Sequence, residues 1–138
     1  MKINTRQFGD LEFTEDLVIT FPKGIIGFED TTRFLIVHDE EYEPFRWLIS
    51  IDDEEIGFPI LNPFLVQPEY GKELPRSYVK RILSSEENWD IFCVVTLKGE
   101  GGKVTINLKS PIVVNYQEKS GEQLILTSEE LQVAKPIS

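Results

Sequence analysis

The central stretch of the chain, residues 45–70, reads FRWLISIDDEEIGFPILNPFLVQPEY. It contains two apolar runs, 45–51 and 56–61, which are separated by four consecutive acids at 52–55. β-Branched and aromatic residues suit a pleated, half-buried strand, and Asp favours turns because its side chain can bond to nearby backbone groups. The stretch therefore predicts two strands joined by an acidic turn.

Two prolines limit how the second of these strands can pair. Pro59 and Pro63 have no backbone N–H to donate, and proline in a sheet is found mainly on edge strands or at strand ends. We therefore expect residues 56–61 to form an edge or rim strand. An irregular arm should lead away from it at Asn62.

Short apolar segments extend this β pattern toward both ends of the chain. Residues 3–8 and 11–13 predict a hairpin around Gly9 and Asp10, because a Gly-containing pair between apolar runs signals a turn. Residues 25–28 predict an irregular rim piece, since a glycine interrupts the apolar run. Further short strands are predicted at 17–21, 33–38, 89–97, 104–108, 111–115 and 123–126.

One segment, at about residues 75–83, has a clear helical period. Pro75 is tolerated in a first turn, and the apolar residues recur on one helical face, namely Leu74, Tyr78, Val79, Ile82 and Leu83. Many short strands with one short helix favour a mainly β, antiparallel, barrel-like fold. We predict that residues 1–138 form a single domain of this class, with a loose C-terminal tail over about 127–138.

The charge of the chain is distributed unevenly. Residues 1–70 contain 5 Lys or Arg and 15 Asp or Glu, a net charge of −10, whereas residues 71–138 contain 9 of each kind. Such a field repels phosphate backbones and anionic membranes, so we expect neither direct nucleic-acid binding nor a membrane partner. It favours a basic protein partner. The alternative is that the acids only keep the protein soluble.

The composition also bears on the compartment. Hydrophobic residues make up 41% of the chain, as in folded proteins, and no apolar run reaches the roughly 18–20 residues needed to cross a bilayer. The N-terminus has no apolar core of a signal peptide, and the single Cys93 fits a reducing compartment. We expect a cytoplasmic protein.

No residue pattern supports catalysis, a metal ion or a cofactor. A zinc site would need the only histidine, His38, together with the distant Cys93. The acids at 52–55 are consecutive, whereas calcium ligands alternate around a Gly-containing loop. We therefore expect no enzyme. Two alternatives stay open: a small-ligand- or carbohydrate-binding β-barrel, and a hydrolase using paired carboxylates such as Asp39 and Glu43.

Bulky side chains lie on both faces of the strand predicted at 45–51. Phe45 and Trp47 share one face, and Arg46 and Leu48 share the other. A sheet that buries only one of its faces needs bulky apolar side chains on that face alone. These aromatics are either core residues or part of an exposed apolar groove rimmed by acids, which is typical of a protein-binding surface.

Three segments form a pattern over nearly the full length of the chain. They are 21–28 (FPKGIIGF), 47–64 (WLISIDDEEIGFPILNPF), and 104–115 (VTINLKSPIVVN) followed by 121–126 (GEQLIL). In this order and spacing they resemble the FliW family of bacterial flagellar assembly factors. The chain departs from the usual family text by carrying LIS at 48–50 and NPF at 62–64.

This resemblance implies a compact β-barrel-like protein without enzymatic activity. Family members bind flagellin in the cytoplasm, and they bind and antagonise CsrA, an RNA-binding translational repressor, so that flagellin level is coupled to flagellin translation. We expect one partner surface, the apolar rim, to consist of Phe45, Trp47, Ile56, Phe58, Asn62, Pro63 and Phe64. A second, the acidic lip, should consist of Asp39, Glu40, Glu41, Glu43, Asp52, Asp53, Glu54 and Glu55.

Overall fold

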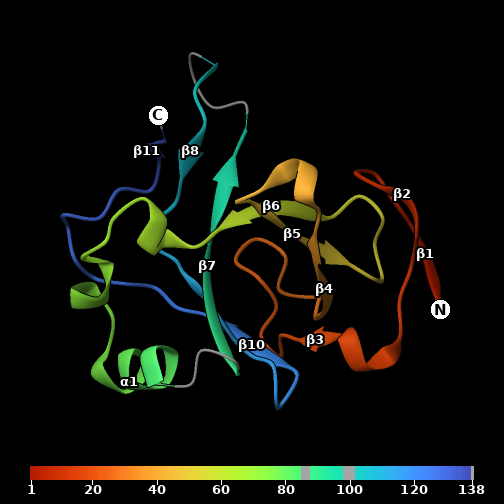
Figure 1. The fold of residues 1–138 in the computed structure, drawn as a ribbon, viewed down its shortest axis with the longest axis horizontal. Helices are drawn as coiled ribbons and strands as arrows, with labels where there is room; N and C mark the ends of the chain where they lie inside the picture. The colour runs from red at the N-terminus through yellow and green to blue at the C-terminus, as the bar shows by residue number, and fades with distance from the viewer. Residues whose placement is uncertain (85–87, 98–101, 138) are drawn as a thin grey trace.

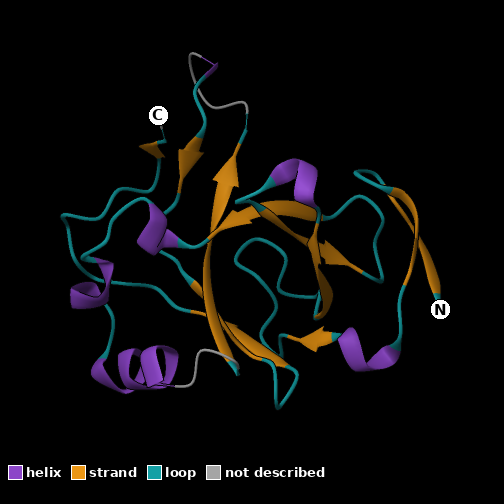
Figure 2. Cartoon of the chain, viewed as in Figure 1, coloured by secondary structure: helices purple, strands orange, loops and turns teal. Residues whose placement is uncertain are grey.

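The computed structural model describes residues 1–84, 88–97 and 102–137 (Figure 1). Its α-helix is α1 (Arg76–Ser84), and its strands are β1 (Lys2–Thr5), β2 (Gly9–Glu12), β3 (Ile19–Thr20), β4 (Arg33–His38), β5 (Arg46–Ser50), β6 (Gly57–Leu61), β7 (Trp89–Thr96), β8 (Thr105–Ile106), β9 (Ile112–Asn115), β10 (Ser120–Gln123) and β11 (Lys135–Pro136). Four 3-10 helices are η1 (Glu15–Leu17), η2 (Glu40–Tyr42), η3 (Pro63–Leu65) and η4 (Tyr70–Glu73). The mainly β fold class is confirmed (Figure 2).

Seven of the strands close into a barrel in the order β3, β4, β5, β6, β7, β9, β10 and back to β3. Strand β7 is long enough to pair along three stretches. Its residues 89–92 pair with β9, Cys93 and Val94 pair with β6, and Val95 and Thr96 pair with β8. Strands β8 and β11 thus extend from one end of β7, beyond the barrel (Figure 1).

The core is divided between the inside of the barrel and two layers outside it. The inner cluster is built on Ile19, Phe21, Ile25, Phe34, Leu48, Ile60, Phe92, Ile112 and Val114. The helix-side cluster lies under α1, η3, η4 and the C-terminal segment, and its buried residues include Tyr70, Leu74, Ile82, Cys93 and Leu131. The hairpin-side cluster joins Phe13, Val18 and Leu35, with Ile3 and Leu11 from the β1–β2 hairpin packed against them. Successive side chains along each barrel strand point alternately inward and outward, so the same strands contribute residues to the inner cluster and to the outer clusters.

Strand β6 is not an edge strand, so that prediction was wrong. It pairs with β5 and with β7. Ser50 N–H donates to Ile56 C=O at 3.1 Å, so these two residues form a hydrogen-bonded pair. Hydrogen-bonded and non-hydrogen-bonded pairs alternate along an antiparallel ladder, and the Trp47–Pro59 pair, three positions further along, is therefore not hydrogen-bonded. The nitrogen of Pro59 therefore faces β7, whose ladder with β6 uses only Ile60 and Leu61. The proline lies where that ladder has already ended.

Helix α1 confirms the predicted helix at 75–83. It packs on the outside of the barrel, and Leu74 and Ile82 are buried in the helix-side cluster. Arg81 lies over the ring of Trp89, 5.6 Å from its centre, and Tyr78 donates a hydrogen bond to Glu122 Oε2 at 3.2 Å. The helix is thereby tied to both β7 and β10.

The ends of the chain differ in detail from the prediction. The first hairpin turns at residues 6–8, not at Gly9 and Asp10, because the Thr5 hydroxyl accepts from Phe8 N–H at 2.9 Å and donates to Gly9 C=O at 2.8 Å. The strand predicted at 123–126 overlaps the observed β10 (Ser120–Gln123) only at Gln123. The C-terminal segment, which we expected to be loose, is packed: Leu131 is buried and β11 pairs with β8.

None of the helices in the described ranges is both long and apolar enough to cross a membrane.

Candidate protein-binding surface

A tight turn at one end of the barrel exposes two apolar side chains. Phe28 N–H donates to Ile25 C=O at 2.6 Å, and Gly27 between them has a φ of +90°. The Ile25 side chain is buried in the inner cluster, which anchors the turn. Ile26 remains 52% exposed and Phe28 39% exposed. Exposed large apolar residues on an anchored turn are available for contact with a partner.

Gly24 is required for this turn to lie where it does. Its φ is +67°, and a Cβ atom there would lie 2.5 Å from the Glu29 carbonyl oxygen. A side chain at this position would therefore be strained and would collide with backbone. The sequence signal was present in the two glycines at 24 and 27, but it did not reveal which residues between them would be exposed.

The turn continues into an apolar surface formed by β6. The Phe28 and Phe58 rings lie 5.2 Å apart, and Ile56 and Phe58 are half-buried against the inner cluster. We call Ile26, Phe28, Ile56 and Phe58 the apolar mouth. These residues share one barrel end because Phe34, near the start of β4, faces Ser50 at the end of β5, and Ile49 faces Gly57 at the start of β6.

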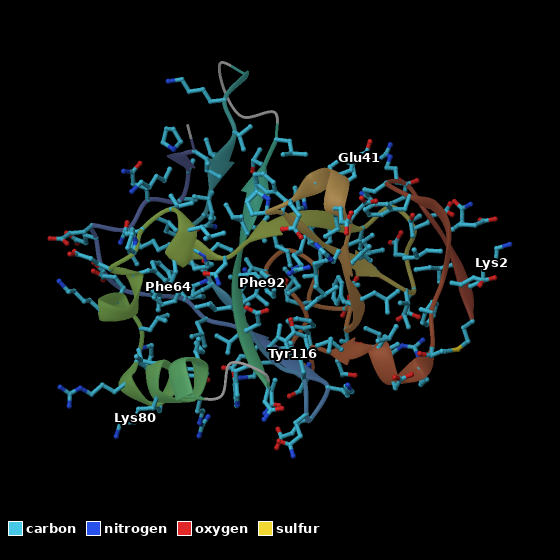
Figure 3. The ribbon with its side chains drawn as sticks, in the orientation of Figure 1. Lys2, Glu41, Phe64, Lys80, Phe92 and Tyr116 are labelled. Atoms are coloured by element: carbon cyan, nitrogen blue, oxygen red, sulfur yellow. The ribbon has the colours of Figure 1, made fainter. Side chains whose placement is uncertain are left out.

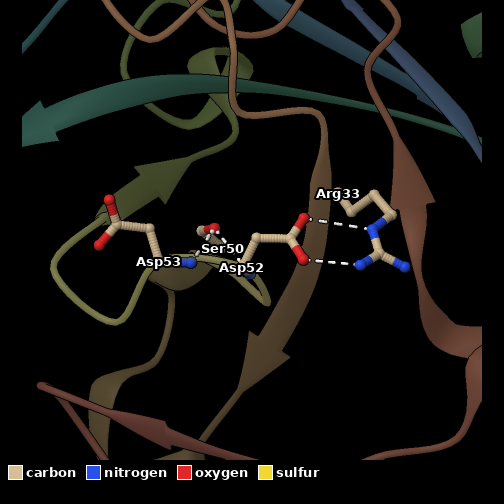
Figure 4. A network of polar contacts seen from close by, with 4 residues as sticks. All are labelled: Arg33, Ser50, Asp52 and Asp53. Atoms are coloured by element: carbon tan, nitrogen blue, oxygen red, sulfur yellow. Dashed lines mark hydrogen bonds and ion pairs between the residues drawn. The ribbon is translucent and has the colours of Figure 1, made fainter.

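The acidic turn at 52–55 lies beside the apolar mouth and is held rigidly (Figure 4). The buried Ser50 hydroxyl oxygen accepts hydrogen bonds from the N–H groups of Asp52 and Asp53, at 3.1 and 3.0 Å. The Asp52 carboxylate accepts two bonds from the Arg33 guanidinium, at 2.6 Å from Nη2 and 3.2 Å from Nε. This hydrogen-bonded pairing raises the pKa of Arg33. A two-point Arg–carboxylate contact fixes orientation as well as charge.

The surroundings of the apolar mouth are strongly acidic. Six exposed carboxylates lie in the two segments that flank it: Glu29, Asp30, Asp52, Asp53, Glu54 and Glu55. Arg33 pairs with Asp52, and Arg6 pairs with Glu55 at 3.1 Å. The other four form no ion pair with any residue in the described ranges. An apolar patch with an acidic border suits a partner that is basic and partly apolar.

The acidic lip predicted from the sequence divides into two groups at opposite ends of β5. The turn at 52–55 follows β5, whereas Asp39, Glu40, Glu41 and Glu43 precede it. In that second group Asp39 Oδ1 accepts from Glu41 N–H at 2.9 Å at the start of η2, and Glu43 pairs with His38. Figure 3 shows Glu41 on the side of the molecule away from Lys80 of α1. The length of β5, Arg46–Ser50, thus separates the two acidic groups along the chain.

The predicted apolar rim also divides. Only Ile56 and Phe58 lie at the apolar mouth. Trp47 points to the outside of β5, where its ring packs edge-on against Phe8 and Tyr42 at 6.0 and 6.2 Å. The Trp47 indole nitrogen is buried and has no hydrogen-bond partner among the described residues.

The remaining residues of the predicted rim belong to the helix-side layer. Phe45 and Phe64 are partly buried against the helix-side cluster, and Pro63 is fully buried. Asn62 accepts from Phe64 N–H at 2.9 Å and so caps η3. Phe45 and Trp47 both lie outside the inner cluster, but Phe45 packs against the helix-side cluster and Trp47 against Phe8 and Tyr42.

One half-buried carboxylate was not predicted from the sequence. Asp90, in β7, accepts hydrogen bonds from Tyr116 Oη at 3.1 Å and from Ile91 N–H at 3.0 Å. Burial raises the pKa of Asp90, and the hydrogen bonds from Ile91 N–H and Tyr116 Oη and the charge of Arg46 lower it to a smaller extent. Burial and the neighbouring Asp90 raise the pKa of Tyr116. Nothing in the sequence around Asp90 distinguished this carboxylate from a solvated one.

Comparison with known proteins extends over nearly the whole chain. A family model described as FliW protein matches residues 2–137. The flagellar assembly factor FliW of Clostridium tetani is 37% identical over 99% of this chain and 95% of its own length. That of Thermotoga maritima is 37% identical over 96% and 90%. A crystal structure of the flagellar assembly factor FliW is 28% identical and superposes with a TM-score of 0.82, covering 99% of this chain and 96% of that one.

Proposed function

Because the chain belongs to the FliW family of flagellar assembly factors, we propose that it acts by binding other proteins and catalyses no reaction. It binds flagellin in the cytoplasm. It also binds a CsrA-type RNA-binding repressor and relieves its action on translation. Competition between the two partners couples the amount of flagellin to its synthesis.

The acidic apolar mouth is the observation that carries this proposal. A protein that binds RNA needs a basic surface to neutralise phosphates, and such a surface is complementary to the carboxylates around the mouth. Electrostatic attraction of this kind accelerates association and weakens as salt is added. The repressor is therefore assigned to the turn at 52–55 and its neighbours Glu29 and Asp30.

The apolar part of the mouth supplies the contact that salt does not screen. Ile26 and Phe28 project from the turn, and Phe58 lies beside them. A partner helix with apolar residues on one face would bury these side chains in helix-in-groove fashion. The same mouth thus combines a salt-dependent contact with a salt-independent one.

Calorimetric titration with purified repressor at low and high salt tests this assignment. The test variant carries Asp53→Asn and Glu54→Gln, two acids with no ion pair among the described residues. The control variant carries Glu40→Gln and Glu41→Gln, which removes the same charge at the other end of β5. We expect the test variant to bind about tenfold more weakly at low salt, a loss of about 1.4 kcal/mol.

The control variant should bind the repressor as the unmodified protein does. If the control variant lost affinity and the test variant kept it, the repressor would belong to the Asp39–Glu43 end instead. Titration with flagellin in the same series shows whether both partners use the mouth. No binding of either partner would refute the proposed function itself.

A further inference from the structure

Strand β4 has a backbone edge that no strand covers over its second half. Strand β3 pairs with β4 only at Phe34 and Arg33. The ladder stops there because the chain before Ile19 turns into η1, in which Leu17 N–H donates to Thr14 C=O at 3.0 Å. Within the described residues, positions 35–38 of β4 therefore pair with β5 on one side and with no strand on the other.

The hydrogen-bond alternation identifies the groups on the open side. Ile51 N–H donates to Arg33 C=O at 3.1 Å, so Arg33 directs its backbone groups toward β5. Because direction alternates along a strand, Leu35 and Val37 also face β5, and Ile36 and His38 face away from it. No other described residue bonds the N–H or C=O groups of Ile36 and His38 on that side. These groups are arranged as a template for one more strand.

A groove of about 310 Å³ runs along this open edge. Tyr116 and Lys119, in the connection between β9 and β10, form the opposite wall. Most of the side chains that line the groove are apolar. Ile19 and Ile36 pack with the inner cluster, Leu35 and Val37 with the hairpin-side cluster, and Leu17 comes from η1. The Leu17 side chain on the groove wall is 55% exposed, so it remains accessible to a bound partner.

We propose that this groove binds an extended peptide segment of another protein, which adds to β4 as an antiparallel strand in line with β3. Its backbone bonds to Ile36 and His38, and its side chains alternate between the inner and outer apolar walls. The segment carries Lys or Arg beside its apolar residues, because the acids Glu12 and Asp16 outnumber Lys119 in the groove lining and the chain has a net charge of −10. This site goes beyond the proposed function and is separate from the apolar mouth.

Amide hydrogen exchange followed by NMR is the first test, and it needs no peptide. In the free protein the N–H groups of Ile36 and His38 should exchange much faster than those of Leu35 and Val37, which bond to β5. Equal protection of all four, at every protein concentration tested, would mean that the edge is covered and would overturn the proposal. Protection that grows with protein concentration would make the occupant a second copy, which also overturns it.

The second test adds a pool of peptides of about seven residues, with Lys at both ends and Val, Ile, Thr or Phe between them. Exchange at Ile36 and His38 should slow in its presence. A matched pool, N-methylated at every residue, has no backbone N–H to donate from either edge of the strand and should have no effect. If the first pool left exchange unchanged, or if both pools acted equally, strand addition would be refuted.

A pair of variants locates the binding site in the groove. Leu17→Gln removes an exposed apolar side chain from the groove wall, and Val133→Gln does the same at a comparably exposed position outside it, 55% against 62% exposed. Leu17→Gln should weaken peptide binding about tenfold, as expected for a leucine that becomes buried on binding. Val133→Gln should leave binding unchanged. Equal behaviour of the two variants would place the peptide elsewhere.

Discussion

Tyr116 donates a hydrogen bond of 3.1 Å to Asp90 on the inner side of the barrel. Asp90 lies two residues before Phe92 of the inner cluster, so its side chain points the same way. Burial raises the pKa of this carboxyl above its ordinary value of 3.8. A carboxyl group that is harder to ionise in the folded protein makes stability depend on pH in a defined direction.

We predict that Asp90→Asn removes a pH-dependent loss of stability. Between 3.8 and the raised pKa, the folded protein holds the proton that the unfolded chain has lost, so the free energy of unfolding falls as pH rises. Each tenfold difference in acid strength contributes about 1.4 kcal/mol. Urea unfolding of both proteins, from pH ~3 to ~7, should therefore show the wild type losing stability relative to the variant as pH rises. A gain instead would mean that the hydrogen bonds from Ile91 N–H and Tyr116 Oη, together with the charge of Arg46, outweigh burial.

Gly121→Ala should destabilise the protein through the inner cluster. A Cβ atom at Gly121 would overlap the ring of Phe21, which is fully buried and cannot move aside. Overpacking of this kind costs about 1–3 kcal/mol. Gly71→Ala is the matched control, because its nearest neighbour would be Phe64 at 3.5 Å, an ordinary contact, and it should change stability by no more than ~0.5 kcal/mol. Thermal and urea unfolding of both variants provide the measurement.

Ile26→Ser should weaken partner binding without weakening the fold. Ile26 is exposed at the apolar mouth, so its removal leaves no cavity. Repressor affinity at high salt, where the electrostatic part is screened, should fall most clearly. Val133→Ser removes a similarly exposed apolar side chain elsewhere and serves as the control. If the Ile26→Ser variant kept its affinity for the repressor and its melting temperature were unchanged, the turn would not be part of the binding surface.

Leu131→Ala tests whether the C-terminal segment is part of the folded core. Leu131 is buried in the helix-side cluster, and truncating a buried leucine costs about 2 kcal/mol or more. The exposed Val133 should tolerate the same substitution within ~0.5 kcal/mol. Chemical unfolding of both variants distinguishes the two cases. Equal stability would indicate that the segment is loose in solution, as the sequence suggested.

Local sequence patterns predicted the strands and the helix well. The run at 33–38 became β4 with the same bounds, and the helix predicted at 75–83 became α1 with a shift of one residue. These elements carry their signal in side-chain periodicity, which is local. The C-terminal segment was expected to be loose because Leu131 is buried by residues distant in the sequence, and a local periodicity does not indicate such a contact.

The candidate site was predicted in composition but not in arrangement. The apolar residues that the sequence grouped into one rim do not stay together: Trp47, Phe58 and Phe64 end in three separate environments. Whether the outer face of a barrel strand is covered depends on which other segment packs over it. The β1–β2 hairpin, which covers Trp47, is distant from it in the sequence, so the local pattern could not indicate this contact. Ile26 was overlooked because its exposure depends on the backbone of Gly24 and Gly27.

Contacts between β3 and β10 close the barrel between residues that are far apart in the chain. Thr20 N–H donates to Lys119 C=O at 2.9 Å, beside the Thr20–Ser120 pair, and the β4–β5 and β5–β6 hairpins by contrast join near neighbours. A long-range contact costs loop-closure entropy before neighbouring contacts offset it. Barrel closure is therefore a late step of folding. In stopped-flow experiments Thr20→Pro, which removes this N–H, should accelerate unfolding and leave the refolding rate nearly unchanged.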